Sequence, residues 1–253
     1  MLRICAFCAK KSQILQKSGL SVRAFWGELF HAIFRSPDAA YPPKAKRQTE
    51  EKGEKKMDWS RKTTVFLGDS ITEGYGVAQG ECWVDAMPGH WINRGISGDT
   101  TAGMRRRFDA HVLRHAPDRV VIMGGINDLS EGGSPAETEE NLFSMYERAR
   151  MNGIVLVPAV CVMPDYDELL GNDWAAYLPA LRGLPDKLEQ LAQWIREYAA
   201  QNGCICLDFA QQFPRFTPDG YCRYFSDGVH PNARGHAVMA EIARHVLYPR
   251  TDL

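Results

Sequence analysis

The chain has 253 residues, of which 45% are hydrophobic and 24% are charged, enough for one large domain with a well-buried core. No stretch approaches the ~18 consecutive apolar residues that a membrane span requires, so we expect no stable membrane insertion. The seven cysteines are odd in number and several lie in apolar runs, which argues against a disulfide framework and favours buried thiols in the reducing cytoplasm.

The chain divides into two parts by charge. Residues 1–56 contain 12 Lys and Arg against 5 Asp and Glu, whereas residues 57–253 contain 18 against 26. The basic residues also differ in kind, since the first part uses mainly Lys and the second almost only Arg. A single folded unit is not expected to change composition so sharply. We therefore predict an N-terminal extension over residues 1–56 and a folded domain over residues 57–253.

The extension does not resemble a secretory signal, because lysines interrupt every apolar stretch and no cleavage site of small residues follows. Apolar residues between Phe25 and Phe34 fall on one helical face, as in a membrane-surface helix. The charged linker over residues 44–56 favours a poorly ordered extension instead. A third hypothesis is that translation starts at Met57, because codons for residues 52–56 can contain the purine-rich sequence of a bacterial ribosome-binding site.

From residue 62 onward, short apolar patterns alternate with amphipathic helical ones. We predict strands at 63–67, 91–94, 120–123, 154–160 and 204–209, and helices at 101–115, 136–152, 185–201 and 233–247. Strands that are apolar on both faces and alternate with helices indicate a parallel sheet covered on both sides. The expected fold is α/β, with ligands outside the carboxyl ends of the strands.

Three residues of complementary chemistry follow such strands or precede the last helix. Ser70 follows the first strand and opens a helix, whose positive end favours developing negative charge. Its hydroxyl is a poor nucleophile until a base removes the proton. Asp227 and His230, three residues apart, offer an imidazole base and a carboxylate to orient it. The structural alternatives are a serine and a histidine that merely cap helices.

Four short motifs together resemble the signature blocks of the SGNH (GDSL-type) hydrolases, the lipase/acylhydrolase family. These are Gly68-Asp69-Ser70, Ile96-Ser97-Gly98-Asp99-Thr100, Gly124-Gly125-Ile126-Asn127-Asp128 and Asp227-x-x-His230. They occur in the family's order and span residues 63 to about 247. The resemblance implies a flavodoxin-like three-layer α/β/α sandwich with about five parallel strands. It also implies ester hydrolysis through an acyl-enzyme on Ser70, without metal or cofactor.

The resemblance assigns the donors of an oxyanion hole as well. These are the backbone N–H groups of Ser70 and Gly98 and the side-chain amide of Asn127. Gly98 suits this role because a residue without Cβ lets the backbone approach the substrate. The alternative for Asn127 is an Asx-turn after the third strand. Gly95 is a weaker donor candidate, because it lies nearer the strand end and fits a turn.

The remaining polar patterns favour no further function. His111 and His115 have a spacing that suits a metal, but no carboxylate accompanies them, so a solvated helix face is expected. The run Arg105-Arg106-Arg107 lies in an acidic domain without interleaved aromatics, so we expect no nucleic-acid binding. No G-x-G-x-x-G follows the first strand, which argues against a dinucleotide cofactor.

Specificity is expected to depend on two long connections. Residues 162–183 are too many for an ordinary loop, and we interpret them as a flap that supplies Tyr166, Trp174 and Tyr177 to the substrate pocket. The alternative is an additional short helix that packs on the domain. Residues 213–225 would form the opposite wall. Such walls suit a small-molecule ester of small to moderate size.

Other activities remain open at this stage. A lysophospholipase or thioesterase, a carbohydrate acetylesterase and an acyl transferase would use the same residues. A non-catalytic carbohydrate-binding relative is an alternative of another class, against which the intact Ser70, Asn127, Asp227 and His230 argue. The oligomeric state and the physiological substrate do not follow from the sequence.

Overall fold

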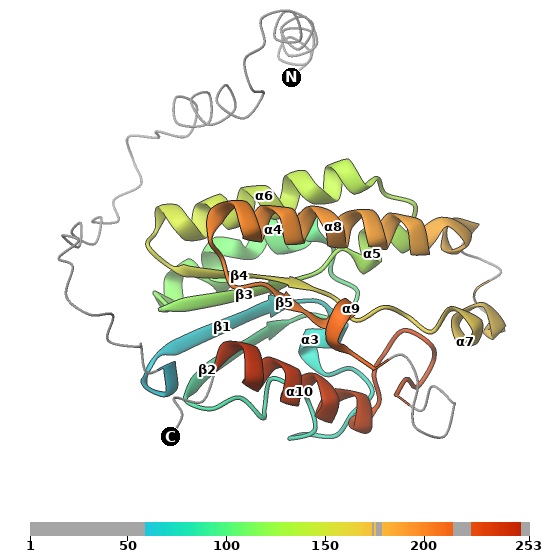
Figure 1. Ribbon diagram of the computed structural model, residues 1–253, viewed down its shortest axis with the longest axis horizontal. Helices are drawn as coiled ribbons and strands as arrows, with labels where there is room; N and C mark the ends of the chain where they lie inside the picture. Colours follow the sequence, from blue (N-terminus) through green and yellow to red (C-terminus); the bar gives the residue numbers. More distant parts are fainter. Residues whose placement is uncertain (1–58, 174, 176–178, 215–223, 249–253) are drawn as a thin grey trace, which may run out of the picture. The chain divides into compact units, whose positions relative to one another are not determined.

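The computed structural model describes residues 59–173, 175, 179–214 and 224–248 (Figure 1). Within these residues the strands form one five-stranded parallel sheet in the order β2-β1-β3-β4-β5. The strands are β1 (Thr63–Gly68), β2 (His90–Gly95), β3 (Arg119–Met123), β4 (Val155–Val160) and β5 (Leu207–Asp208). The predicted α/β fold with a parallel sheet is confirmed.

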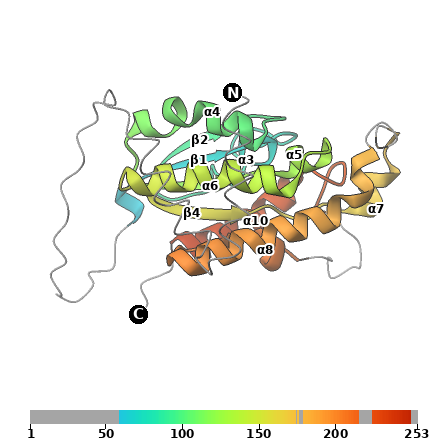
Figure 2. The same ribbon diagram turned by 90° about the horizontal axis from the view of Figure 1, so that it is seen from above.

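Helices cover both faces of the sheet and make the three layers. One face carries α4 (Thr101–His111), α6 (Pro135–Met151) and α8 (Leu184–Asn202), and the other carries α10 (Ala233–Leu247) (Figure 1). Figure 2, seen from above, shows α6 lying between α4 and α8, and α6 contacts both of them. None of the helices in the described residues is both long and apolar enough to cross a membrane.

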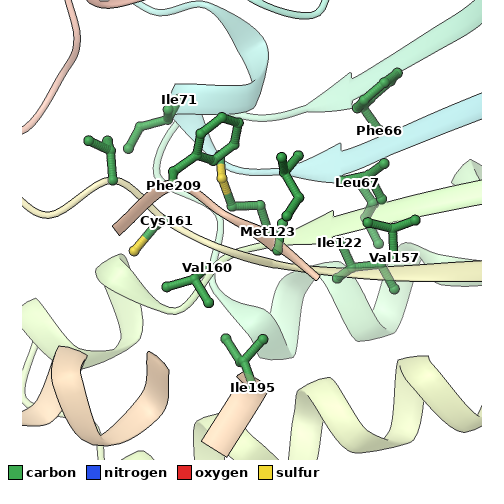
Figure 3. Close-up of a cluster of buried hydrophobic side chains, with 14 of the residues drawn as sticks. Phe66, Leu67, Ile71, Ile122, Met123, Val157, Val160, Cys161, Ile195 and Phe209 are labelled. Atoms are coloured by element: carbon green, nitrogen blue, oxygen red, sulfur yellow. The ribbon is translucent and has the colours of Figure 1, made fainter. Parts of the chain in front are cut away.

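The core lies on both sides of the central strands, because their side chains alternate between two covered faces. Val65, Phe66 and Leu67 of β1 are completely buried. Figure 3 shows part of this core, in which strand side chains meet Ile71, Phe209 and other residues of the surrounding helices. Each large aliphatic or aromatic side chain buried in this way contributes about 1.5–3 kcal/mol of transfer free energy.

Short helices follow four of the five strands at the carboxyl edge of the sheet. The described short helical elements are η1 (Trp59–Arg61), α3 (Ser70–Glu73), η2 (Leu113–His115), α5 (Ile126–Ser130), α7 (Tyr166–Gly171), η4 (Pro179–Gly183) and α9 (Phe209–Gln212). Of these, α3, α5, α7 and α9 follow β1, β3, β4 and β5. The carboxyl edge is therefore lined with helix N-termini and the loops that lead into them.

Two predicted elements differ in length from those observed by more than two residues. The strand predicted at 204–209 is only Leu207–Asp208, because it pairs with just two residues of β4, and Asp208 then caps α9 by accepting the N–H of Gln211. The helix predicted at 101–115 ends at His111 and continues as a separate 3-10 turn. The predicted extension lies outside the described residues, so the boundary near residue 57 stays a prediction.

Candidate active site

Ser70 lies at the carboxyl end of β1 and is the first residue of α3. Asp69 precedes it as the N-cap, and Oδ1 of Asp69 accepts a hydrogen bond from the backbone N–H of Ile71 at 3.0 Å. This turn leaves Ser70 largely buried, with 5% of its surface exposed. The tight strand-to-helix turn therefore holds the Ser70 hydroxyl at the edge of the sheet.

The N-cap carboxyl itself is in an unusual environment. Asp69 is buried, and its Oδ2 has no hydrogen-bond partner among the described residues. Burial raises the pKa of Asp69 from 3.8 to about 7, although the hydrogen bond from Ile71 acts in the opposite direction. The residue next to the candidate nucleophile thus changes charge near neutral pH.

The structure brings Ser70, His230 and Asp227 together from the two ends of the domain. Oγ of Ser70 lies 3.0 Å from Nε2 of His230, and Nδ1 of the same ring lies 2.7 Å from Oδ2 of Asp227. A proton on Nδ1, donated to Asp227, leaves the lone pair of Nε2 directed at the Ser70 hydroxyl. The three side chains form a continuous hydrogen-bonded series from carboxylate to hydroxyl.

The second carboxylate oxygen of Asp227 binds the backbone. Oδ1 accepts the N–H groups of Val229 at 3.0 Å and His230 at 2.8 Å. Partial burial by itself raises the pKa of this carboxyl, but hydrogen bonds from the backbone and ring of His230 outweigh that effect and hold the pKa of Asp227 below its ordinary value. Asp227 is therefore ionised at neutral pH and suited to stabilise an imidazolium.

Gly98 lies in the loop that follows β2, and Asn127 lies in the first turn of α5, which follows β3. Nδ2 of Asn127 donates to the carbonyl oxygen of Asp99 at 2.9 Å, so this side chain bonds across to the neighbouring loop and not to its own backbone. Gly98 is exposed, has a left-handed φ of +74°, and has no heavy atom within 4 Å of the place of a Cβ. The two predicted oxyanion donors are thus joined through Asp99, with open space beside Gly98.

An arginine of α4 connects this loop to the nucleophile turn. The guanidinium of Arg107 donates through Nε to Oδ2 of Asp99 at 2.6 Å and through Nη2 to the carbonyl oxygen of Gly68 at 2.9 Å. Both charged side chains are 13% exposed. Sequence reasoning missed this role, because three consecutive arginines resemble a basic patch. The available signal was the spacing from Asp99 to Arg107, which spans two turns at the start of a helix.

Two carboxylates hold the ends of the same loop. Oε2 of Glu73 accepts the backbone N–H of Ser97 at 2.8 Å and also bonds its hydroxyl. The carboxylate of Asp128 accepts the backbone N–H of Thr101 at 2.9 Å and the Thr101 hydroxyl at 2.5 Å. Residues 97–101 are therefore fixed at both ends, which is the preorganisation that an oxyanion site requires.

Tyr75 is a further residue that sequence reasoning missed. Its ring centroid lies 4.6 Å from that of His230 at an interplanar angle of 49°, and 54% of its surface is exposed. An exposed aromatic beside the imidazole is placed to contact a substrate. The sequence signal was weak, since Tyr75 is a single aromatic in the turn that ends α3.

Of the three predicted substrate-binding residues, only Tyr166 lies within the described residues, and Trp174 and Tyr177 lie outside them. Tyr166 opens α7 and lines a cavity of about 470 Å³. The cavity lies between residues 162–167 and the start of α8, and its lining also includes Ala210, Phe213, Pro214 and Phe225. Ser70, Asp227 and His230 are not among its lining residues. The substrate role of Tyr166 therefore stays a prediction.

The described part of the predicted flap includes the short helix α7, which packs on the domain as in the structural alternative. Leu169 of α7 is completely buried. The backbone N–H of Asp165 donates to the carbonyl oxygen of Gly228 at 2.8 Å. Nδ2 of Asn172, the C-cap of α7, donates to the carbonyl oxygen of Asp227 at 3.0 Å. The helix thus lies against the loop that carries Asp227 and His230.

The two histidines of α4 and the turn after it face arginines. Nη1 of Arg107 lies 3.0 Å from Nδ1 of His111, and Nη2 of Arg94 lies 3.1 Å from Nε2 of His115. In the described part of the chain, no three His, Cys, Asp or Glu side chains gather as a metal site would require. Each ring therefore has one nitrogen bonded to a guanidinium.

Several known proteins are similar to this chain. A model of the GDSL-like lipase/acylhydrolase family matches residues 66–238. The chain is 34% identical to esterase TesA of Pseudomonas aeruginosa over 114 residues, which cover 41% of this chain and only 57% of that protein. It is 27% identical to thioesterase 1/protease 1/lysophospholipase L1 of Escherichia coli over 194 residues, which cover 74% of this chain and 84% of that protein.

Solved structures agree with this assignment. A GDSL-like lipase of Bacteroides thetaiotaomicron superposes with a TM-score of 0.58 at 28% identity, covering 73% of this chain and 86% of that one. The family match extends over all four motifs, from Phe66 of β1 to beyond His230. The resemblance predicted from those motifs is therefore confirmed, and the chain belongs to the GDSL-like lipase/acylhydrolase family.

Proposed function

We propose that the protein is a serine esterase that hydrolyses carboxylic esters of small to moderate size through an acyl-enzyme on Ser70. The observation that carries this proposal is the series of hydrogen bonds from Asp227 through His230 to the Ser70 hydroxyl, with distances of 2.7 and 3.0 Å. A serine, a base and an orienting carboxylate in this order are the requirements of nucleophilic acyl transfer.

In the first half of the reaction, Nε2 of His230 accepts the proton as Oγ of Ser70 attacks the ester carbonyl carbon. The carbonyl oxygen becomes a tetrahedral oxyanion. The C–O bond to the alcohol then breaks, and the imidazolium returns its proton to the departing alcohol oxygen. Ionised Asp227 stabilises the imidazolium while the proton is held there.

The oxyanion is proposed to be stabilised by the backbone N–H groups of Ser70 and Gly98 and by the amide of Asn127. One hydrogen of that amide is used by the carbonyl of Asp99, which leaves the other for the substrate. Such donors act most strongly when they are positioned before the charge develops. Loss of one commonly costs about 2.7–4 kcal/mol of transition-state stabilisation.

The second half repeats the chemistry with water. His230 takes a proton from a water molecule while the water oxygen attacks the acyl-enzyme carbonyl carbon. The imidazolium then gives this proton to Oγ of Ser70 as the bond between Oγ and the acyl carbon breaks and the acid leaves. The surface that receives the substrate includes Tyr75, whose exposed ring adjoins His230. No metal or cofactor is needed in this scheme.

A fluorophosphonate probe tests the proposed chemistry, because it reacts with an activated serine and releases fluoride. The wild-type protein should become labelled at Ser70, and Ser70→Ala should remain unlabelled. A non-catalytic carbohydrate-binding relative would stay unlabelled in the wild-type form too. That result, together with no turnover of p-nitrophenyl acetate, would reject the esterase function.

The length of the acyl chain distinguishes two candidate substrate classes. Each CH₂ buried in a channel contributes about 0.8 kcal/mol, so a shallow site gains only from the first few carbons. We expect kcat/KM on p-nitrophenyl esters to be highest for acetyl to butyryl chains. It should be lower for acyl chains of about eight carbons or more. The named activities of the Escherichia coli relative favour the other candidate, a thioesterase or lysophospholipase. A maximum at long chains would select that candidate.

Two further predictions concern the cellular location of the protein and its binding partners. A cytoplasmic location is proposed from cysteine usage, and the four cysteines within the described residues are free thiols. The lack of nucleic-acid binding likewise stays a prediction from the composition of the domain.

A further inference from the structure

The loop that carries Asp227 and His230 closes on itself. The backbone N–H of Ser226 donates to the carbonyl oxygen of His230 at 2.8 Å, and Phe225 and Pro231 form an isolated antiparallel bridge. These bonds define the turn of residues 225–231, here called the acid–base loop. They do not connect the loop to the strand ends where Ser70 lies, so its position relative to Ser70 depends on contacts with other elements.

Residues of the α7 segment bond two successive carbonyls of the acid–base loop. Nδ2 of Asn172 donates to the carbonyl oxygen of Asp227 at 3.0 Å. The backbone N–H of Asp165 donates to the carbonyl oxygen of Gly228 at 2.8 Å. These bonds flank α7, one before its first turn and one at its C-cap. The α7 segment therefore contacts the acid–base loop at Asp227, the residue that orients the imidazole, and at Gly228.

The backbones of the two segments are in direct contact. Gly228 has a φ of +82°, and a Cβ there would lie 2.5 Å from the backbone nitrogen of Leu169 and 2.8 Å from the carbonyl oxygen of Asp165. Only glycine permits both this conformation and this approach. Because Leu169 is completely buried, α7 is itself anchored to the core. The acid–base loop thus packs closely against a helix that is anchored to the core.

Asn172 joins the helix and the loop with one amide group. Besides the carbonyl of Asp227, its Nδ2 donates to the carbonyl oxygen of Glu168 at 3.0 Å. An amide has two hydrogens, one for each of these acceptors, whereas a carboxylate of the same shape has none. The carbonyl that Asn172 holds belongs to the residue whose side chain bonds Nδ1 of His230.

We propose that Asn172 is a positioning residue that holds the acid–base loop so that Asp227 and His230 stay aligned on Ser70. This role rests on the proposed esterase function, in which His230 is the base. Asn172 touches neither substrate nor reacting atoms in this scheme. Its loss should lower kcat more than it raises KM, because misalignment of a catalytic group affects the chemical step.

Asn152 provides a matched control. It is the C-cap of α6, and its Nδ2 donates to the carbonyl oxygen of Arg148 at 2.8 Å, just as Asn172 bonds Glu168. Asn152 is exposed, and among the described residues its hydrogen bonds go to α6 alone. Asn152→Ala therefore removes the capping bond of an asparagine without any contact to the acid–base loop.

The experiment compares Asn172→Ala, the isosteric Asn172→Asp and Asn152→Ala with the wild type. Three measurements are made: steady-state kinetics on p-nitrophenyl acetate, which give kcat and KM, the fluorophosphonate labelling rate, and the downfield proton resonance of the His230 Nδ1–H bonded to Asp227. We expect both Asn172 variants to lose about 10- to 100-fold in kcat and in labelling rate, with the resonance broadened or shifted. Asn152→Ala should keep all three.

Several outcomes would overturn the positioning role. Wild-type kcat and an unchanged resonance in the Asn172 variants would do so, as would an equal loss in Asn152→Ala. If Asn172→Ala does not fold, Asn172→Asp carries the test, since it keeps the shape of the side chain. The resonance is measured without substrate. If the wild-type protein shows the Nδ1–H resonance but is not labelled by the probe, the esterase function is rejected. The positioning role is then tested by the resonance of the Asn172 variants alone.

Discussion

The two sides of the proposed active centre are held in different ways. The nucleophile side comes from the ends of β1, β2 and β3, which are neighbours in the sheet, and Arg107 and the carboxylates of Glu73 and Asp128 join its loops. The acid–base side is a single loop, closed by its own bonds and placed against α7. The register of the sheet positions the nucleophile side, whereas the position of the acid–base side depends on hydrogen bonds from other elements of the chain.

The largest expected effect tests whether the two sides act as one unit. Ser70→Ala and His230→Ala should each lower kcat by roughly 10⁴-fold or more, and the double variant should be little worse than either single one, because neither group works without the other. Steady-state kinetics on p-nitrophenyl acetate measure this, with circular dichroism to establish folding. Near-normal turnover in purified Ser70→Ala would end the serine-hydrolase proposal.

The next effect isolates the nucleophile side. Asn127→Ala should lower kcat by about 10²- to 10³-fold, because it removes one oxyanion donor and also the bond that ties this amide to Asp99. The acid–base side stays intact, so the Nδ1–H resonance of His230 should be unchanged. Asn152→Ala is the control for loss of an amide elsewhere. A loss in Asn127→Ala no greater than in that control would remove Asn127 from the oxyanion hole.

Two buried titratable groups, Asp69 beside Ser70 and His236 on α10, should give opposite pH dependence of stability. Asp69, beside Ser70, has a folded pKa raised from 3.8 to about 7 by burial, so the folded state binds its proton more tightly than the unfolded state. The wild type should therefore lose stability relative to Asp69→Asn as pH rises from about 4 to about 7. A Tm difference that grows by a few degrees over this range is expected, measured by thermal denaturation.

His236, on α10, supplies the counterpart. Its Nδ1 accepts the backbone N–H of Trp83 at 3.3 Å, and burial lowers its pKa from 6.5 to about 4. Here the unfolded state binds the proton more tightly, so the wild type should lose stability relative to His236→Asn as pH falls from 6.5 towards 4. Tm differences that are flat with pH, or of the same sign for both variants, would contradict these assignments.

The smallest expected effect concerns the extension. The family match begins at residue 66 and β1 begins at Thr63, so a protein that starts at Met57 retains every described element. We expect it to keep the Tm and the kcat/KM of the full chain, because every residue assigned to the proposed site lies after Met57. A large drop in Tm would show that the extension packs on the domain.

Much of the fold followed from local patterns. Apolar runs alternating with amphipathic ones indicated a parallel sheet, and such sheets collect functional groups at the carboxyl ends of their strands. The length of β5 did not follow, because pairing with Ala159 and Val160 of β4 decides it. Its flanking residues have strand-like composition, but a strand exists only where a partner is within hydrogen-bonding reach.

The same division applies to the site. Ser70, Asn127, Asp227 and His230 could be named from the sequence, because reactive side chains in short motifs are local features. Arg107, Tyr75 and Asn172 were missed, since each contacts a neighbour distant in sequence or depends on exposure that only folding decides. Chemistry is carried by residue type and order, whereas alignment to within a fraction of an ångström is a property of packing. The sequence by itself determined which groups are present, and the tertiary structure decided what holds them in line.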